Sequence, residues 1–406
     1  MRVGHYVSVA SVQKGRERNV SGHIQIPLES LRRLRDAGHY ARLITNEFGE
    51  DRTLPACMPD GVGTDFVTDG RRRKGFLEGK TNAADARGVY PFRLLAQVQQ
   101  IKRIVNEQKL DVLHFFGHTR TALLAGGLRL VGLRCPVVVT ALVEPPPPNL
   151  FVRPVWRRID AIVSSTDYVT KGFERAGLAC TTLRHGVIRD LREELGDERP
   201  GLRNRVLYWR DPTESNGADL CAAAFDALAP EFPHYSFEFA IRPWRDEVKA
   251  IEEVAARHSN VQVHRFPYPP GMSLPKLVAE SALVVLPFRK LSLDPQLAVA
   301  ESLAAGSPVV TTNMRSNPEL VVDGETGALA PPDDATALTE VMRRLLVNPD
   351  NLAAMGRRAA EDFRTRWNWD RYLPELLSIY ERVTSRRALP ERTTHDAARE
   401  VESATT

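Results

Sequence analysis

The fold of this chain is decided by the stretch LDPQLAVAESLAAGSPVVTTN, residues 293–313. It begins with a turn-forming Asp-Pro pair, continues through an apolar segment that holds one carboxylate, Glu301, and ends on Gly-Ser-Pro before a Val-rich run. The apolar segment predicts a buried helix, and the β-branched run after the glycine predicts a strand. A carboxylate in so apolar a helix needs an explanation, because carboxylates are seldom buried without a partner.

On both sides of this stretch, short β-rich runs alternate with helical patterns, which predicts parallel sheets with crossover helices. The predicted strands of the first half are 3–9, 41–46, 111–116, 136–141 and 161–166, and those of the second half are 205–209, 236–241, 261–266, 283–288 and 308–312. Between the first two strands, Leu28, Leu31 and Leu34 mark a helix face that stops at Gly38. We therefore predict an α/β fold with two doubly wound, Rossmann-like domains that face a central cleft.

The domain boundaries follow from length and composition. A chain of 406 residues suits two domains of ordinary size. Charge, Pro and Gly gather at 197–204, so we place the first domain at 1–198 and the second at 199–367. Residues 368–384 predict an amphipathic terminal helix, and the polar remainder, 385–406, predicts a disordered tail.

Composition excludes several classes of protein. A hydrophobic content of 43% and a charged content of 26% are typical of a soluble globular protein. No apolar run reaches the roughly 18 residues that span a membrane, and the first residues turn polar too early for a signal peptide, so we expect a cytoplasmic protein. The four cysteines show no C-x-x-C pairing, so neither a zinc site nor a disulfide framework is indicated. A net charge of +4 does not indicate a nucleic-acid partner.

One basic cluster stands out, formed by Arg71, Arg72, Arg73 and Lys74. Two interpretations stay open for it. The cluster is a solvated loop, or it contacts an anionic acceptor or the inner face of a membrane.

The predicted cleft is lined by the carboxyl ends of strands, where open α/β sheets bind their ligands. Helix N-termini point to such a cleft and favour phosphate. Glu301 falls within the first turns of a helix of this kind, where its carboxylate could accept hydrogen bonds from a diol such as a ribose. A partly solvated helix carboxylate is the alternative interpretation.

Residues 286–346 resemble the C-terminal domain of family-four glycosyltransferases, which have the GT-B fold. Weaker matches precede it in the family's order: RLRDAGHYARLITN at 33–46, IDAIVSSTDYVTKGF at 159–173 and RVLYWRDPTESNGADLCAAAF at 205–225. The resemblance therefore extends over most of the chain.

The resemblance implies a retaining transferase that moves a sugar from a UDP-, GDP- or TDP-linked donor to a hydroxyl of a small molecule, lipid head group or polysaccharide. It implies neither a metal ion nor another cofactor. As the bond between sugar and phosphate breaks, negative charge grows on the diphosphate, so the protein must supply fixed cations and amide dipoles. No carboxylate of the first domain is indicated as a general base, since in similar enzymes the departing phosphate can take the acceptor's proton.

The resemblance also implies the site residues of the second domain. Arg210 matches the diphosphate-binding cation of the family, and Asn216 occupies the place of a lysine. Arg289, with Lys290 beside it, could replace the missing charge or could be an ordinary surface residue. The first carboxylate of the family motif would fall on Leu293, so we expect Asp294 to stand in for it, with the helix residues Leu297 and Glu301 also at the donor.

In the first domain, Gly22 matches one glycine of a family pair that approaches the donor, although Ser21 could instead cap the helix that follows. His118 is the expected contact to the transferred sugar, and His114 is interpreted as a buried core histidine.

Two other functions remain open. An epimerase or phosphorylase on the same architecture would need its own acid and base residues or a pyridoxal-binding lysine, and the sequence indicates neither. A non-catalytic protein that binds nucleotide sugars or glycans on a GT-B scaffold would explain both the missing lysine and the altered carboxylate motif.

Overall fold

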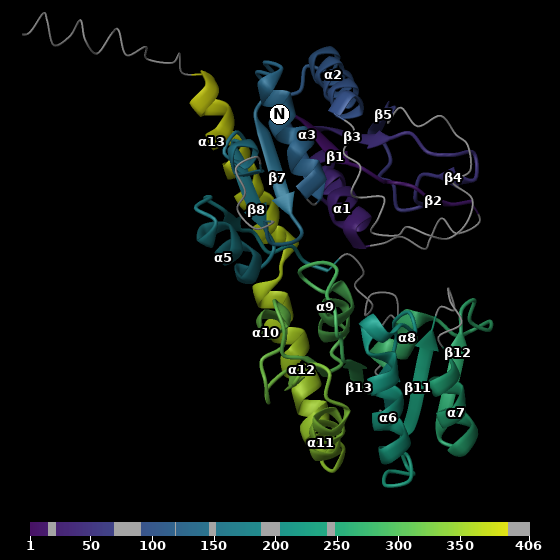
Figure 1. Ribbon diagram of the computed structural model, residues 1–406. Coiled ribbons are helices and arrows are strands. Elements are labelled where there is room, and N and C mark those ends of the chain that lie inside the picture. Colours follow the sequence, from purple (N-terminus) through teal and green to yellow (C-terminus); the bar gives the residue numbers. More distant parts are fainter. Residues whose placement is uncertain are drawn as a thin grey trace, which may run out of the picture.

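The computed structural model describes residues 1–14, 22–68, 91–117, 119–145, 152–187, 204–241 and 248–388. Two α/β lobes lie one above the other, and helix α13 (Trp369–Ala388) leaves the second lobe and runs along the first (Figure 1). The expected basic cluster at 71–74 and the expected boundary at 197–204 lie outside the described residues, apart from Asn204.

The first domain is built on a seven-stranded sheet in the order β5-β3-β1-β6-β7-β8-β9. All its strand pairs are parallel. Val7 lies level with Thr45 of β3 and Phe116 of β6, so these strands end together at one edge. The elements of this domain, with a small β2–β4 ribbon, are β1 (Arg2–Val7), β2 (Val12–Gln13), α1 (Gly22–Asp36), β3 (Tyr40–Asn46), β4 (Arg52–Thr53), β5 (Gly63–Val67), α2 (Pro91–Glu107), β6 (Val112–Gly117), α3 (Thr119–Leu130), β7 (Val137–Ala141), α4 (Val152–Trp156), β8 (Ala161–Ser164), α5 (Asp167–Arg175) and β9 (Thr181–Thr182).

The second domain has a six-stranded parallel sheet in the order β12-β11-β10-β13-β14-β15. Its elements are β10 (Arg205–Tyr208), the 3-10 helix η3 (Glu214–Asn216), α6 (Ala218–Leu228), β11 (Ser236–Ile241), α7 (Lys249–Arg257), β12 (Val261–Arg265), α8 (Leu274–Ala279), β13 (Ser281–Leu286), α9 (Leu297–Ala304), β14 (Val309–Thr312), α10 (Asn317–Leu320), β15 (Gly327–Ala330), α11 (Ala335–Leu346) and α12 (Pro349–Arg366).

All ten predicted strands are present, and the strands that the sequence did not indicate lie mostly at sheet edges. Strand β5 is mostly solvent-accessible, so its residues GTDFV lack the apolar pattern of a buried strand. Strand β15 has the sequence GALA, and a side chain at Gly327 would meet the carbonyl oxygen of Val309 at 2.2 Å. Edge strands thus escaped prediction because their burial is one-sided or their side chains are small.

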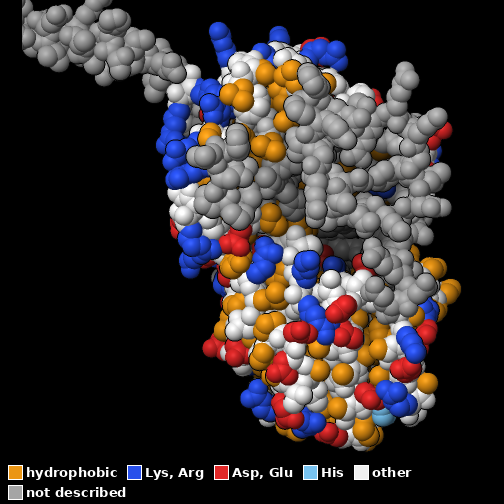
Figure 2. All heavy atoms as spheres, viewed as in Figure 1, with side chains coloured by type: hydrophobic (Ala, Val, Ile, Leu, Met, Phe, Trp, Pro, Cys, Tyr) orange, Lys and Arg blue, Asp and Glu red, His pale blue; other side chains and the backbone are white. Residues whose placement is uncertain are grey.

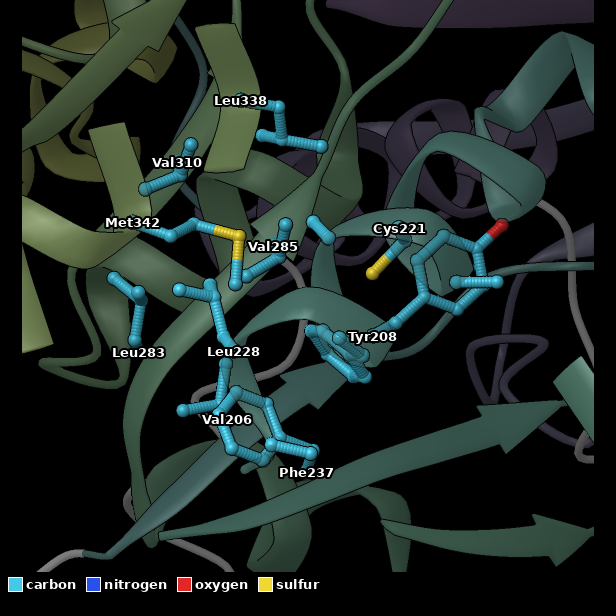
Figure 3. Close-up of a cluster of buried hydrophobic side chains, with 14 of the residues drawn as sticks. Val206, Tyr208, Cys221, Leu228, Phe237, Leu283, Val285, Val310, Leu338 and Met342 are labelled. Carbon is cyan, nitrogen blue, oxygen red and sulfur yellow. The ribbon is translucent and has the colours of Figure 1, made fainter. Parts of the chain in front are cut away.

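Alternate residues of each central strand face opposite layers of helices. In the second domain, Val206 and Tyr208 pack with α6 and α11, whereas Leu207 packs with α9 and α12 on the other face. Figure 3 shows the first of these layers, in which Met342 of α11 lies over Val285 and Leu228. Such two-sided burial accounts for the continuous apolar runs from which the strands were predicted.

Helix α13 completes the core of the first domain. Its residues Tyr372, Leu376 and Ile379 join one apolar cluster with Leu31 of α1 and Val3 of β1. The helix continues to Ala388, four residues past the end expected for it, and residues 389–406 lie outside the described ranges. None of the described helices combines the length and apolar character that a membrane crossing requires.

A buried hydrogen-bond chain ties α13 to the first sheet. The Tyr380 hydroxyl lies 2.6 Å from Nδ1 of His114 and 3.3 Å from Nε2 of His5. Nε2 of His114 lies 2.7 Å from Thr140 Oγ1, and Nδ1 of His5 lies 3.2 Å from the Pro27 carbonyl oxygen. His114 is therefore a fully buried, hydrogen-bonded core histidine, as predicted.

Replacing Tyr380 by Phe should lower the free energy of unfolding by about 1–3 kcal/mol, because both imidazoles would lose a buried partner. Urea denaturation monitored by circular dichroism measures this change. Tyr235→Phe is the matched control, since the hydroxyl of Tyr235 bonds to none of the described residues. Equal stability losses in the two variants would show that the hydrogen-bond chain contributes nothing specific.

The buried histidines also predict how stability depends on pH. Burial lowers the pKa of His5 to about 3 and that of His185 to about 4, and burial together with the charge of His5 lowers the pKa of His114 below its usual value of 6.5. Since these folded pKa values lie below the unfolded value, the unfolded chain binds more protons below pH 6.5. Stability should therefore be full above pH 6.5 and should fall as the pH drops from 6.5 toward 4.

Each of these imidazoles should contribute a loss of up to about 1.4 kcal/mol per pH unit in that window. Urea denaturation at about pH 7.5 and about pH 5 measures the slope, and His185→Gln should reduce it by about one proton. An unchanged slope in this variant would contradict the buried neutral state of His185.

Candidate active site

The candidate site lies where the carboxyl ends of the two sheets approach each other. The backbone N–H of Asp294, in the loop before α9, donates to the carbonyl oxygen of Leu142, just after β7, at 3.0 Å. Figure 2 shows basic and acidic side chains of described residues close together where the two lobes meet. The loop that follows β13 therefore meets the loop that follows β7 of the first domain.

Arg210 lies two residues past the end of β10 and is half-buried. Its buried Nε atom has no hydrogen-bond partner, and no ion pair joins it to another described residue. An unpaired guanidinium group keeps its full charge and its planar array of donors for an anionic ligand. Among the described residues, Arg210 is thus a cation without a paired carboxylate, and its role at the diphosphate stays a prediction.

Asn216 shapes the loop after β10. Its Nδ2 donates to the carbonyl oxygen of Asp211 at 3.0 Å, and its backbone N–H donates to Oγ1 of Thr213 at 3.3 Å. The hydroxyl of Tyr208 donates to the same Asp211 carbonyl at 3.0 Å. The amide group that stands in place of a lysine is therefore used to fold the loop.

Gly217 ends this turn with a left-handed backbone, at φ +70°. A Cβ atom here would lie 1.8 Å from the carbonyl oxygen of Pro287, just past β13. Only glycine allows the two loops to approach so closely.

Arg289 is not a free cation in this structure. Its Nη2 lies 2.7 Å from Oδ2 of Asp219, its Nε lies 2.5 Å from Oδ1 of Asp333, and its Nη1 donates to the Glu214 carbonyl oxygen at 3.1 Å. Burial alone would raise the pKa of Asp219, but the hydrogen bonds and charge of Arg289 outweigh it and hold that pKa low. Whether Arg289 replaces the missing lysine charge stays a prediction, while Lys290 beside it is exposed.

Asp294 is buried and already engaged. Its Oδ1 accepts a hydrogen bond from the Ser316 hydroxyl at 2.5 Å, and its Oδ2 forms an ion pair with Nη2 of Arg315 at 2.5 Å. Burial raises its pKa, although Ser316 and Arg315 act in the opposite direction. The side chain has no exposed area, and the expectation that it replaces the sugar-binding carboxylate stays a prediction.

The remaining expected residues are distributed as follows. Glu301 lies half-buried in α9, and Leu297, at the start of that helix, packs against the apolar cluster of the first domain that contains Trp369. Gly22 is the first residue of α1, and His118 lies outside the described residues. Within the described part of the chain, no group of three or more His, Cys, Asp or Glu side chains is placed to hold a metal ion.

Sequence reasoning missed the polar contacts between the domains. The carboxylate of Glu319 in α10 accepts hydrogen bonds from the backbone N–H groups of Asp167 and Tyr168, at 2.7 and 2.6 Å. Arg315, with φ +48°, places its guanidinium carbon 5.6 Å from the ring centroid of Tyr168. About 150 residues separate these partners in sequence, so no local pattern could reveal them.

Adding a side chain at Gly217 should destabilise the fold and displace the loops of the site. Gly217→Ala should destabilise the protein by about 2–4 kcal/mol, because backbone strain and a clash add together. Gly271→Ala is the matched control, since Gly271 also has a positive φ, +84°, but open space around it. That control should cost only about 1–2 kcal/mol of backbone strain, and equal losses in thermal unfolding would contradict the steric argument.

Comparison with known proteins shows the fold of the chain and the family that its second domain resembles. The structure superposes on a glycosyltransferase from Rickettsia africae with a TM-score of 0.69 and 14% identity, covering 94% of this chain and 98% of the other. It superposes on Anabaena Alr3699/HepE, determined with UDP and glucose, with a TM-score of 0.63 and 14% identity, covering 93% and 98%. The two facing sheets thus have the GT-B fold, which confirms the predicted architecture.

Residues 203–348 match the sequence profile of the family described as "Glycosyl transferases group 1". The second domain is therefore similar to the group 1 glycosyltransferases, over a range that includes the stretch in which the sequence resemblance is strongest.

Curated relatives agree with this assignment over part of their length. An exopolysaccharide phosphotransferase of Streptomyces coelicolor is 26% identical over 59% of this chain, but the match spans only 25% of that protein. A D-inositol 3-phosphate glycosyltransferase of Streptomyces avermitilis is 30% identical over 32% of this chain and 28% of its own length. A GDP-mannose-dependent phosphatidylinositol monomannoside mannosyltransferase of Mycolicibacterium smegmatis is 25% identical over 69% of this chain and 79% of its own.

Proposed function

We propose that this chain is a glycosyltransferase that moves a sugar from a nucleotide sugar to an acceptor hydroxyl, with retention at the anomeric carbon and without a metal ion. The observation that carries the proposal is the guanidinium of Arg210, just past the carboxyl end of β10, which pairs with no other residue in the described part of the chain. In the proposed reaction the bond between the sugar and the phosphate breaks and the acceptor oxygen bonds to the sugar on the same face. The departing nucleotide carries the bonding electrons and takes the acceptor's proton.

Arg210 would stabilise the negative charge that grows on the diphosphate as this bond breaks. Its position in a partly buried loop supports this role, because a fixed cation acts more strongly where water is excluded. No neighbouring carboxylate neutralises it among the described residues, whereas Arg289 is bound to two. Charge stabilisation in the donor site would therefore fall mainly on Arg210.

The named relatives suggest where a search for donor and acceptor should begin. The mycobacterial relative is named for GDP-mannose and a phosphatidylinositol glycolipid, and the Anabaena structure contains UDP and glucose. Thermal shift with UDP-, GDP- and TDP-sugars in the presence of EDTA would identify a donor, since a ligand at a hundredfold excess over Kd stabilises by about 2.7 kcal/mol. Inositol phosphates are a reasonable first set of acceptors.

Arg210→Ala should weaken donor binding by about ten- to a hundredfold, the value of hydrogen bonds to a charged group. Isothermal titration calorimetry with the donor found by thermal shift measures the effect. Arg210→Lys should restore part of the affinity, because the charge returns without the planar array of donors. Arg344→Ala, an exposed arginine on α11, is the control and should bind normally. Unchanged affinity in Arg210→Ala would remove the basis of the proposal.

A non-catalytic protein that binds nucleotide sugars is the second candidate. It is favoured by the engagement of Asp294 with Arg315 and Ser316, which leaves the expected sugar-binding carboxylate buried. Mass spectrometry of released nucleotide separates the two functions. Binding of a donor without any turnover, in the presence of a broad acceptor set, would favour the binding protein.

A further inference from the structure

We propose that Glu319 is a positioning residue that fixes the angle between the two domains by capping helix α5 from the other side of the cleft. The proposal rests on what we call the α5–α10 contact, formed by Glu319 with the backbone of Asp167 and Tyr168 and with the side chain of Arg184. Figure 1 shows α5 of the upper lobe close to α10 of the lower one, on the side where α13 passes between them.

The contact satisfies donors that a helix cannot satisfy itself. The first N–H groups of an α-helix have no partner within the helix. In α5 the Thr166 hydroxyl accepts from Val169 N at 3.3 Å, while the N–H groups of Asp167 and Tyr168 donate to Glu319 at 2.7 and 2.6 Å. A carboxylate at this end is also favoured by the helix dipole. One side chain of the second domain, Glu319, thus accepts two of these three hydrogen bonds from the N-terminus of α5.

Charge keeps the carboxylate in place. Nη2 of Arg184 lies 2.7 Å from Oδ2 of Asp167 and 3.5 Å from Oε2 of Glu319, so the guanidinium separates the two acids. The side chain of Glu319 is 19% exposed, so solvent screens these interactions less than at an open surface.

Both sides of the contact are anchored within their own domains. On α10, the Asn317 amide donates to Thr311 Oγ1 at 3.1 Å, and Arg366 of α12 donates to the Glu319 carbonyl oxygen at 2.6 Å. On α5, Thr170 Oγ1 lies 2.8 Å from the Ser164 hydroxyl of β8. A rotation of one domain against the other must therefore break or pivot on the α5–α10 contact.

The described residues next to the places where the chain passes from one domain to the other, 185–187 and 367–369, lie beside this contact. The Trp369 indole donates to the Val187 carbonyl oxygen at 2.8 Å, and the ring of His185 stacks on that of Trp369 at 5.6 Å. Arg184, which belongs to the α5–α10 contact, also lies 5.8 Å from the ring centroid of Trp367. The α5–α10 contact and these segments lie on one side of the molecule, and the edge strands β5 and β12 lie on the other (Figure 1). If the chain is a transferase as proposed, Glu319 would hold Arg210 at a set distance from the first domain.

The test measures the interface without any donor. Hydrogen exchange of the peptide that carries Asp167 and Tyr168 should be about tenfold faster in Glu319→Ala, the ratio that corresponds to the loss of a helix cap. The exchange rate in Glu319→Gln should fall between those of the unchanged protein and Glu319→Ala, because an amide offers only one acceptor oxygen. The control is Glu325→Ala, an exposed acid six residues further along. Peptides from α11, which is capped by its own Asp334, should exchange normally in every variant.

Spin labels on the exposed Cys57 and on Glu361→Cys, with Cys135 and Cys180 replaced by Ser, report the distance between the domains. In Glu319→Ala the distance distribution should broaden relative to Glu325→Ala. Distributions and exchange rates equal to those of the control would overturn the proposal. So would faster exchange throughout the second domain, which would make Glu319 an ordinary structural acid. Neither measurement needs catalysis, so both test the role of Glu319 even if the protein has no transferase activity.

Discussion

The architecture depends on the attachment of the last helix to the first strand. The Tyr380 hydroxyl lies within hydrogen-bond distance of both His5 and His114, deep in the first domain, although some 375 residues separate Tyr380 from His5. Around this point, Leu376 and Ile379 fill the same apolar cluster as Leu31. Because the chain reaches α13 from the second domain, this anchorage also joins the two lobes. Without it the two sheets would be connected along the chain after β9 and by polar contacts such as those of Asp294 with Leu142 and of Glu319 with Asp167.

Electrostatics divides the arginines of the cleft into two kinds. Arg289 and Arg315 are bound to carboxylates and serve to hold loops together. Arg210 has no such partner among the described residues, although it is half-buried, as Arg289 and Arg315 are. A cation whose charge is already matched gains little from an anionic ligand, whereas an unmatched one gains the full interaction. Whether an arginine is paired with a carboxylate thus distinguishes residues that look alike in the sequence.

The fold could be predicted from the sequence wherever burial is two-sided. Strands such as Val137–Ala141 are buried on both faces and read as continuous apolar runs, and the Leu28, Leu31, Leu34 face of α1 follows helical spacing. The site was harder to predict. Arg210 was identified from the family resemblance, but the pairing of Arg289 with Asp219 joins positions 70 residues apart. The engagement of Asp294 by Arg315 depends on how two loops meet in space, which residue spacing cannot show.

The place of α13 has a consequence for synthesis of the chain. The face of the first sheet that carries Val3 and Val163 is covered in part by residues 369–388, which are translated only after the entire second domain. During translation the first domain therefore stands with an uncovered apolar face while the ribosome makes residues 204–366, and such faces attract chaperones or misfold. The unit that folds as one body is discontinuous in sequence. Exchange of the first domain between related enzymes would have to carry this distant helix with it.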